Sequence, residues 1–199
     1  MTLKRKEFPQ LSTESGQIGW SMGLWLLLFL GVLLSTCLQV DVYKATARYL
    51  EDALAASNLA AAVIDIEEYG ISHTVRIASP EEAYGRYGVA LKGNLGLDDN
   101  GYCANKDLIT GPVRTARFIV YNVEGNNVEI FEMNTDGTFQ KRQSELGMIY
   151  TPGGEPVEAT GIYSEISYEI KGIFGTTVQA QKGKLVDVCM NEPQKEEEG

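Results

Sequence analysis

One stretch near the N-terminus limits the fold more than any other feature: residues 18–40 contain no charged side chain. At about 1.5 Å of rise per residue, a helix over Ile18–Val40 would measure about 34 Å, enough to cross a bilayer core of roughly 30 Å. Its densest apolar part is Trp20–Leu34. The sequence therefore predicts a transmembrane helix over residues 18–40.

The charges on either side of this stretch predict its orientation. Lys4, Arg5 and Lys6 precede it, whereas acidic and basic residues are mixed after Asp41. Basic segments favour the cytoplasmic side of a membrane. We therefore expect a single-pass protein of the cell membrane, with residues 1–17 as a cytoplasmic leader and the C-terminal domain outside.

Two other interpretations of the apolar stretch stay open. Ala45-Thr46-Ala47 has the small-x-small form of a signal-peptide cleavage site, which would leave Arg48 at or near the new N-terminus. Leu34-Ser35-Thr36-Cys37 resembles a lipobox, in which Cys37 would carry the lipid. In either case residues 18–40 would not remain as a transmembrane helix.

Small residues recur within the predicted span. Gly19 and Gly23 form a G-x-x-x-G pair, and Gly31 and Ser35 repeat the spacing. Small residues at this spacing let membrane helices approach closely. These four positions are candidate helix-packing residues.

Residues 41–69 are predicted to continue the helix outside the membrane as a stalk. Asp41–Glu68 lacks Gly and Pro and is rich in alanine, so its helix propensity is high, and Gly70 is expected to end the helix. Positions at alternating steps of four and three form one seam. Its members are Tyr43, Ala47, Leu50, Leu54, Ser57, Ala61 and Ile64. The seam is expected to pack either on the chain's own domain or in a bundle of several chains.

Residues 70–190 are predicted to form an extracytoplasmic α+β domain. Ser79 followed by Pro80 and two glutamates predicts a short helix over Pro80–Asn94. Hairpin patterns begin at Val113, and the last strand, Thr176–Met190, is expected to be interrupted near Gly183. The predicted fold is a long membrane-and-stalk helix, a second short helix and an antiparallel sheet of about four to six strands, a pilin-like layout. Residues 191–199 are expected to be a disordered acidic tail.

Charge and cysteine content limit the function. The net charge is −10 and most of it lies after residue 40, so a nucleic-acid partner is not expected, because phosphate binding needs clustered positive charge. Cys103 and Cys189 are a possible disulfide if the domain is exported. The sequence contains no C-x-x-C pair.

Catalytic motifs are not evident. His73 is the single histidine, and the sequence contains no G-x-S-x-G, phosphate-binding loop or H-E-x-x-H. The acids around Asp98 and Asp99 lack the spacing of an EF-hand. We therefore expect no enzymatic activity, no cofactor and no metal site.

A basic leader, an apolar helix continuing as an alanine-rich stalk and a terminal sheet resemble pilins and pseudopilins. Within that group, Glu14-Ser15-Gly16-Gln17 before the span resembles the N-terminus of TadE-like pseudopilins of the Tad (Flp) pilus machinery. The resemblance implies leader cleavage between Gly16 and Gln17, although the glutamate of the fifth mature position is replaced by Ser21.

The resemblance further implies a structural component of a surface pilus or secretion apparatus. Its partners would be the membrane and other pilin-like or pilus-assembly proteins, or copies of itself. The alternative is a stand-alone surface adhesin or ligand-binding module on a stalk.

Overall fold

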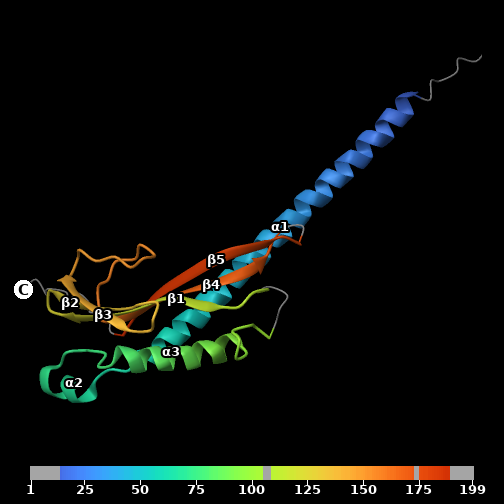
Figure 1. The fold of residues 1–199 in the computed structure, drawn as a ribbon. Coiled ribbons are helices and arrows are strands. Elements are labelled where there is room, and N and C mark those ends of the chain that lie inside the picture. Colours follow the sequence, from blue (N-terminus) through green and yellow to red (C-terminus); the bar gives the residue numbers. More distant parts are fainter. Residues whose placement is uncertain (1–13, 105–108, 173–174, 189–199) are drawn as a thin grey trace, which may run out of the picture. The chain divides into compact units, whose positions relative to one another are not determined.

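The computed structural model describes residues 14–104, 109–172 and 175–188, and within these ranges it contains three helices and five strands (Figure 1). The helices are α1 (Glu14–Ala61), α2 (Ile66–Ser72) and α3 (Pro80–Leu95). The strands are β1 (Arg114–Glu124), β2 (Asn127–Met133), β3 (Phe139–Glu145), β4 (Gly161–Lys171) and β5 (Thr177–Asp187). The predicted tail, 191–199, and most of the predicted leader lie outside the described residues.

The chain divides into two compact units, Met1–Tyr43 and Lys44–Gly199, which are described separately. In the first unit the described residues belong to the first part of α1. Its large apolar side chains, Trp20 and Trp25 among them, are exposed. This is the single described helix that is long and apolar enough to cross a membrane, as the charge-free sequence predicted.

The second unit is built on one five-stranded sheet in the order β3-β2-β1-β4-β5, with every neighbouring pair antiparallel. The α+β class and the antiparallel sheet are therefore confirmed. Two tight turns connect its first three strands. Gly125 (φ 57°) opens the turn between β1 and β2, and Gly137 (φ 84°) lies between β2 and β3, both in a region that glycine enters without steric cost.

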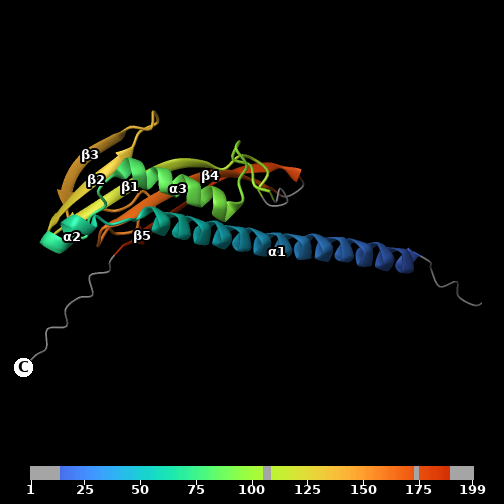
Figure 2. The ribbon, with the colours of Figure 1, turned by 90° about the horizontal axis from the view of Figure 1, so that it is seen from below.

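Each face of the sheet carries a hydrophobic cluster. On one face, the part of α1 after Lys44 and helix α3 pack against β1 and β4, with Leu50, Leu54, Tyr87, Phe118 and Ile162 fully buried (Figure 2). The opposite face packs against the segment between β3 and β4. Its buried members are Ile119, Tyr121, Val128, Ile130, Ile149, Val157 and Tyr163. Both clusters are built from alternating strand residues, as a two-sided sheet requires.

Helix α3 has the boundaries that its sequence signals predicted, one residue longer at the C-terminal end. The Ser79 hydroxyl accepts a hydrogen bond from the Glu82 N–H, and Pro80 occupies the first turn. Gly96 ends the helix in the left-handed conformation.

The stalk helix is shorter than predicted. Helix α1 ends at Ala61 rather than continuing to Glu68, and residues 62–65 are not helical. The β-branched residues Val63 and Ile64 have lower helix propensity than the alanines before them. The Asp65 N–H donates a hydrogen bond to the Arg76 carbonyl, so the chain leaves the path of α1 at this point. Gly70 lies inside α2, and the left-handed residue that ends α2 is His73 (φ 56°).

The interruption predicted in the last strand is also wrong. Strand β5 pairs with β4 continuously from Thr177 to Asp187, through Gly183. A β-carbon at Gly183 would overlap the phenol of Tyr163 on β4. This glycine therefore makes room for an aromatic ring and does not break the strand.

Candidate assembly surfaces

The predicted packing residues of the span are open. A β-carbon built at Gly19, Gly23 or Gly31 would meet no atom within 4 Å, and Ser35 is exposed. Cys37 follows Gly19 by about five full helical turns, so the two lie on the same helix face. The first unit thus presents small residues and a thiol on its surface.

The predicted cleavage residues, Gly16 and Gln17, belong by backbone to the first turns of α1. The exposure of these two residues lies outside the described part of the structure. Cleavage between them stays a prediction.

Most of the predicted stalk seam faces the chain's own domain. Leu50, Leu54, Ser57 and Ala61 are buried, Ala47 is half-buried, and Ile64 lies beyond the helix end. Tyr43, in the first unit, accepts a hydrogen bond from the Gln39 amide (3.1 Å). Leu50, Leu54 and Ala61 pack in the core of the same chain, which is the first of the two packing alternatives. Ser57 accepts a hydrogen bond from Asn94 of α3.

Helix α1 is fastened to the edge strand β5 by an ionic cluster. One carboxylate oxygen of Glu51 lies 2.8 Å from the Lys182 ammonium and the other lies 2.9 Å from that of Lys184. Hydrogen bonds from Lys182 and then Lys184 lower the pKa of Glu51 to about 2. Strand β5 is an edge strand and pairs only with β4 within the described sheet. The ionic cluster therefore gives β5 a second attachment, to α1.

Polar contacts also fix α1 against α3 and the sheet. The Tyr49 hydroxyl donates to the Asn94 carbonyl (3.0 Å), and the Asn94 amide donates to the Ser57 hydroxyl (3.0 Å). The buried Asn58 amide donates to the Lys184 carbonyl of β5 (2.8 Å). These bonds define how the two helices lie relative to each other in the second unit.

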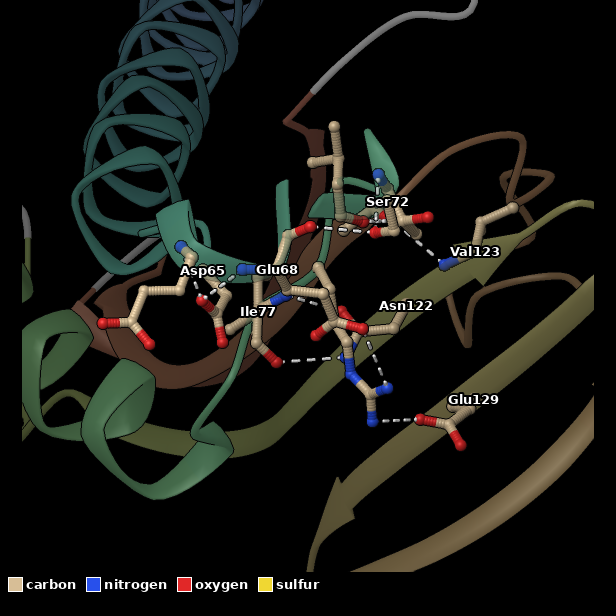
Figure 3. A network of polar contacts seen from close by, with 12 residues as sticks. Asp65, Glu68, Ser72, Ile77, Asn122, Val123 and Glu129 are labelled. Carbon is tan, nitrogen blue, oxygen red and sulfur yellow. Dashed lines mark hydrogen bonds and ion pairs between the residues drawn. The ribbon is translucent and has the colours of Figure 1, made fainter. Parts of the chain in front are cut away.

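The connection from α1 to α3 is pinned to the sheet by side chains (Figure 3). The Asn122 amide, buried on β1, accepts from the Ile77 N–H (2.9 Å) and donates to the Ile77 carbonyl (3.0 Å). The Thr160 hydroxyl donates to the Val75 carbonyl and accepts from the Val123 N–H. Residues 75–77 are thereby held beside β1 much as a short extra strand would be.

An ionic group secures the same connection. The Arg76 guanidinium lies 2.6 Å from the Glu129 carboxylate on β2 and 3.9 Å from that of Glu68 on α2. Lys141 on β3 also contacts Glu129 and is the main cause of the lowered pKa of that carboxyl. Helix α2 is therefore tied through Arg76 to the sheet.

Helix α2 itself buries none of its residues. Ile66 is 75% exposed and Ile71 is 87% exposed, with Val63 and Tyr69 also exposed nearby. Several exposed apolar side chains in one short segment make it a candidate interaction site. The sequence analysis did not predict this exposure, because it assigned Val63 and Ile66 to a long stalk helix. The apolar residues on either side of Gly70 were the signal available in the sequence.

A second surface lies between α1 and α3. It is an open groove of about 580 Å³, lined by Ala60, Glu82, Gly85, Arg86, Val89 and Ala90. Val89 is 77% exposed, and Gly85 has open space where a side chain would stand. Glycine inside a helix lowers its stability, so a glycine there often has another role. Gly85 inside the predicted helix over Pro80–Asn94 was therefore the signal in the sequence for such an opening.

The remaining candidates have structural roles in the described residues. The Asp98 carboxylate accepts from the Asn100 and Tyr102 N–H groups, and Asp99 pairs with Lys92. Within residues 14–104, 109–172 and 175–188, no three His, Cys, Asp or Glu side chains form a metal-binding group. Cys103 is buried, and its predicted partner Cys189 lies outside those ranges, so the disulfide stays a prediction.

Comparisons with protein-family models, curated proteins and solved structures find no match for this chain.

Proposed function

We propose that this chain is a membrane-anchored, pilin-like structural subunit of a surface pilus or secretion apparatus. It acts by assembling with copies of itself or with other pilin-like proteins. The N-terminus is cytoplasmic and the domain from Lys44 onward is outside the cell membrane. The TadE-like resemblance around Gly16 and Gln17 motivates the pilus assignment.

One observation carries the proposal: a single helix, α1, serves both units. Its first part is charge-free and apolar between residues 18 and 40, and its last part is a core element of the sheet domain, through Leu50, Leu54 and Ala61. A tether that only held a module at the surface would not need to be a core element of that module. A subunit whose membrane helix also organises its head is suited to assembly by helix packing.

The mature N-terminus of the native protein tests the processing part of the proposal. Mass spectrometry of the membrane-extracted protein is expected to find Gln17 first. A lipidated Cys37 or an N-terminus near Arg48 would overturn the proposal, because the apolar helix would then be absent from the mature chain. Met1 first would contradict pilin-type processing and favour the stand-alone surface module.

Disulfide cross-linking through Cys37 in intact membranes tests the assembly part. We expect Cys37–Cys37 dimers, and we expect Gly19→Leu with Gly23→Leu, on the same helix face, to reduce them by about fivefold or more. Ser21→Leu, a small residue on the opposite face of α1 from Cys37 and outside the four packing positions, is the matched control. A complete lack of cross-linked species between tagged copies, both with Cys37 and with a thiol-independent amine cross-linker, would contradict self-assembly.

A further inference from the structure

The polar attachment of β5 to α1 stops before the strand ends. Among the described residues, its last position is Lys184, whose ammonium contacts Glu51. Residues 185–188, which we call the β5 end, are held by pairing with β4 and by a hydrogen bond from the Val188 N–H to the Thr160 carbonyl (2.8 Å). None of the residues of β5 is fully buried. An edge segment with so few buried contacts can open locally while the rest of the sheet stays folded.

Asp187, the last residue of β5, carries a carboxylate oxygen without a partner. Its Oδ1 is buried and accepts no hydrogen bond from the described residues. The register places Asp187 opposite Gly161 of β4, and a β-carbon built at Gly161 would lie 3.0 Å from this oxygen. The oxygen therefore lies against the backbone of β4, in space that the glycine leaves free. A buried polar atom without a partner costs free energy, and the cost is larger when the group is charged.

The charged side chains that act on Asp187 are carboxylates. Burial is the largest cause of its raised pKa, and Glu158 and then Glu155 raise that pKa further. Both glutamates belong to the segment between β3 and β4, which packs on the same face of the sheet as Asp187. The ionised form of Asp187 is thus disfavoured twice, by burial and by repulsion.

The other titratable groups on the neighbouring elements are engaged elsewhere. Lys184, the nearest cation along β5, is paired with Glu51 of α1. Tyr163 on β4 faces the same side of the sheet as Asp187, and its hydroxyl donates a hydrogen bond to Glu165 (3.3 Å). Neither neighbour compensates the charge of the Asp187 carboxylate.

Protonation of Asp187 should therefore stabilise the β5 end. Because the folded-state pKa of Asp187 lies above its ordinary value of 3.8, the folded chain holds a proton that the unfolded chain releases. The stabilisation is complete below pH 3.8 and is lost as the pH rises through the folded-state pKa. The sign is opposite to that of Glu51, whose contribution is lost as the pH falls.

We propose that the β5 end is a pH-sensitive latch, closed on β4 when the Asp187 carboxyl is protonated and opening more readily when it is charged beside Glu155 and Glu158. Opening breaks the bond from Val188 to Thr160, while the ionic attachment of the earlier part of β5 to α1 stays in place. The latch belongs to the sheet domain alone. It goes beyond the proposed function and does not require assembly.

Hydrogen exchange of the full-length chain in detergent, read at the Val188 amide, tests the latch. Asp187→Asn keeps the shape of the side chain but cannot be charged. We expect the protection of Val188, corrected for the intrinsic effect of pH, to be about fivefold higher or more in Asp187→Asn than in the native chain at about pH 7. The difference should shrink at about pH 4, because a larger fraction of the native carboxyl is then protonated. The contribution of Glu51 is common to both proteins and cancels.

Two further variants separate repulsion from net charge. Glu158→Gln removes the stronger of the two neighbouring charges and should raise the protection of Val188 at about pH 7 by about twofold. Glu145→Gln is the matched control, because it removes the same charge at the exposed end of the other edge strand, β3. It should leave the protection of Val188 unchanged. The exchange of the β1 amides checks that each variant is folded.

The outcomes decide the proposal in either direction. Equal protection of Val188 in the native chain and Asp187→Asn at about pH 7 would overturn the latch, and so would an equal rise in Glu145→Gln or no rise in Glu158→Gln. A rise in Asp187→Asn that is as large at about pH 4 would attribute the gain to the amide and not to the lost charge. If Asp187→Asn does not fold, the native chain decides, since protection that does not fall between pH 4 and pH 7 contradicts the latch. Cross-linking through Cys37 bears on the proposed function alone.

Discussion

The Glu51 carboxylate on α1 and the Lys184 ammonium on β5 form a hydrogen-bonded ion pair of 2.9 Å between positions 133 residues apart in the chain. Lys182, two residues earlier on the same strand, contacts the other carboxylate oxygen at 2.8 Å. The pair connects the helix that continues from the apolar span to the outer edge of the sheet. Its strength should therefore affect how firmly the edge strand is held.

Glu51→Gln is expected to destabilise the second unit by about 1 kcal/mol at neutral pH, since the group is partly exposed and its ion pairs are screened by solvent. Guanidinium titration of the full chain in detergent, followed by near-ultraviolet circular dichroism of the tyrosines, measures this. Asp52→Asn, at the neighbouring exposed position, is the control and should change stability less. Equal losses for the two variants would contradict a specific role for Glu51.

The same pair predicts a pH dependence. The folded-state pKa of Glu51, about 2, lies below the ordinary value of 4.5, so its contribution is complete above pH 4.5 and is lost as the pH falls toward 2. The stability difference between the native chain and Glu51→Gln should therefore shrink between about pH 4.5 and pH 2. Titrations at several pH values check this, and a difference that stays constant over that range would show that the lysines do not lower this pKa.

Asn122 offers a test of the connection that positions α2. Asn122→Leu removes both bonds to Ile77 and leaves a buried N–H and a buried carbonyl unpaired, which should cost about 2–4 kcal/mol. Hydrogen exchange of residues 66–79 is expected to become faster, while α3 keeps its protection until the whole unit unfolds. Asn134→Leu, in an exposed turn, is the control. Unchanged exchange in residues 66–79 would show that Asn122 does not hold the connection.

Local signals in the sequence were sufficient for some elements and not for others. The apolar span, the Ser79 cap and the hairpin pattern that begins near Val113 are set by residues within a few positions of each other, and these were predicted. The end of α1 depends on a bond from Asp65 to Arg76. The continuity of β5 depends on Tyr163, on the neighbouring strand. Such contacts between distant residues are invisible in local propensities.

The candidate site was likewise predicted only in the part that local sequence signals determine. The seam at Leu50, Leu54, Ser57 and Ala61 was predicted as a packing surface from its spacing alone, but spacing could not decide what it packs against. The exposed apolar residues of α2 and the groove between α1 and α3 become visible only in the structure, because the sequence does not show whether an isoleucine such as Ile71 is exposed or buried. Exposure is a property of the folded chain.

Cys103 predicts a labelling pattern that also tests the proposed disulfide. Burial raises the pKa of its thiol, and the reactive thiolate is therefore scarce in the folded chain. Iodoacetamide is expected to leave Cys103 unmodified until the second unit is unfolded, whereas the exposed Cys37 should react in detergent without unfolding. Fast labelling of Cys103 in the folded chain would contradict its burial. Peptide mass spectrometry without reductant would then show directly whether it is joined to Cys189.

Gly183 and Tyr163 provide the sharpest test of the sheet. Gly183→Ala places a methyl group where the Tyr163 phenol lies, and overpacking of this kind should cost about 1–3 kcal/mol. Tyr163→Leu alone should also destabilise, since it removes a buried ring. The double variant should be more stable than the sum of the two losses predicts, because the leucine leaves room for the methyl group. Gln181→Ala, which lies on β5 away from this ring, serves as the control for strand substitutions, and strictly additive losses in the double variant would show that the ring does not explain the glycine.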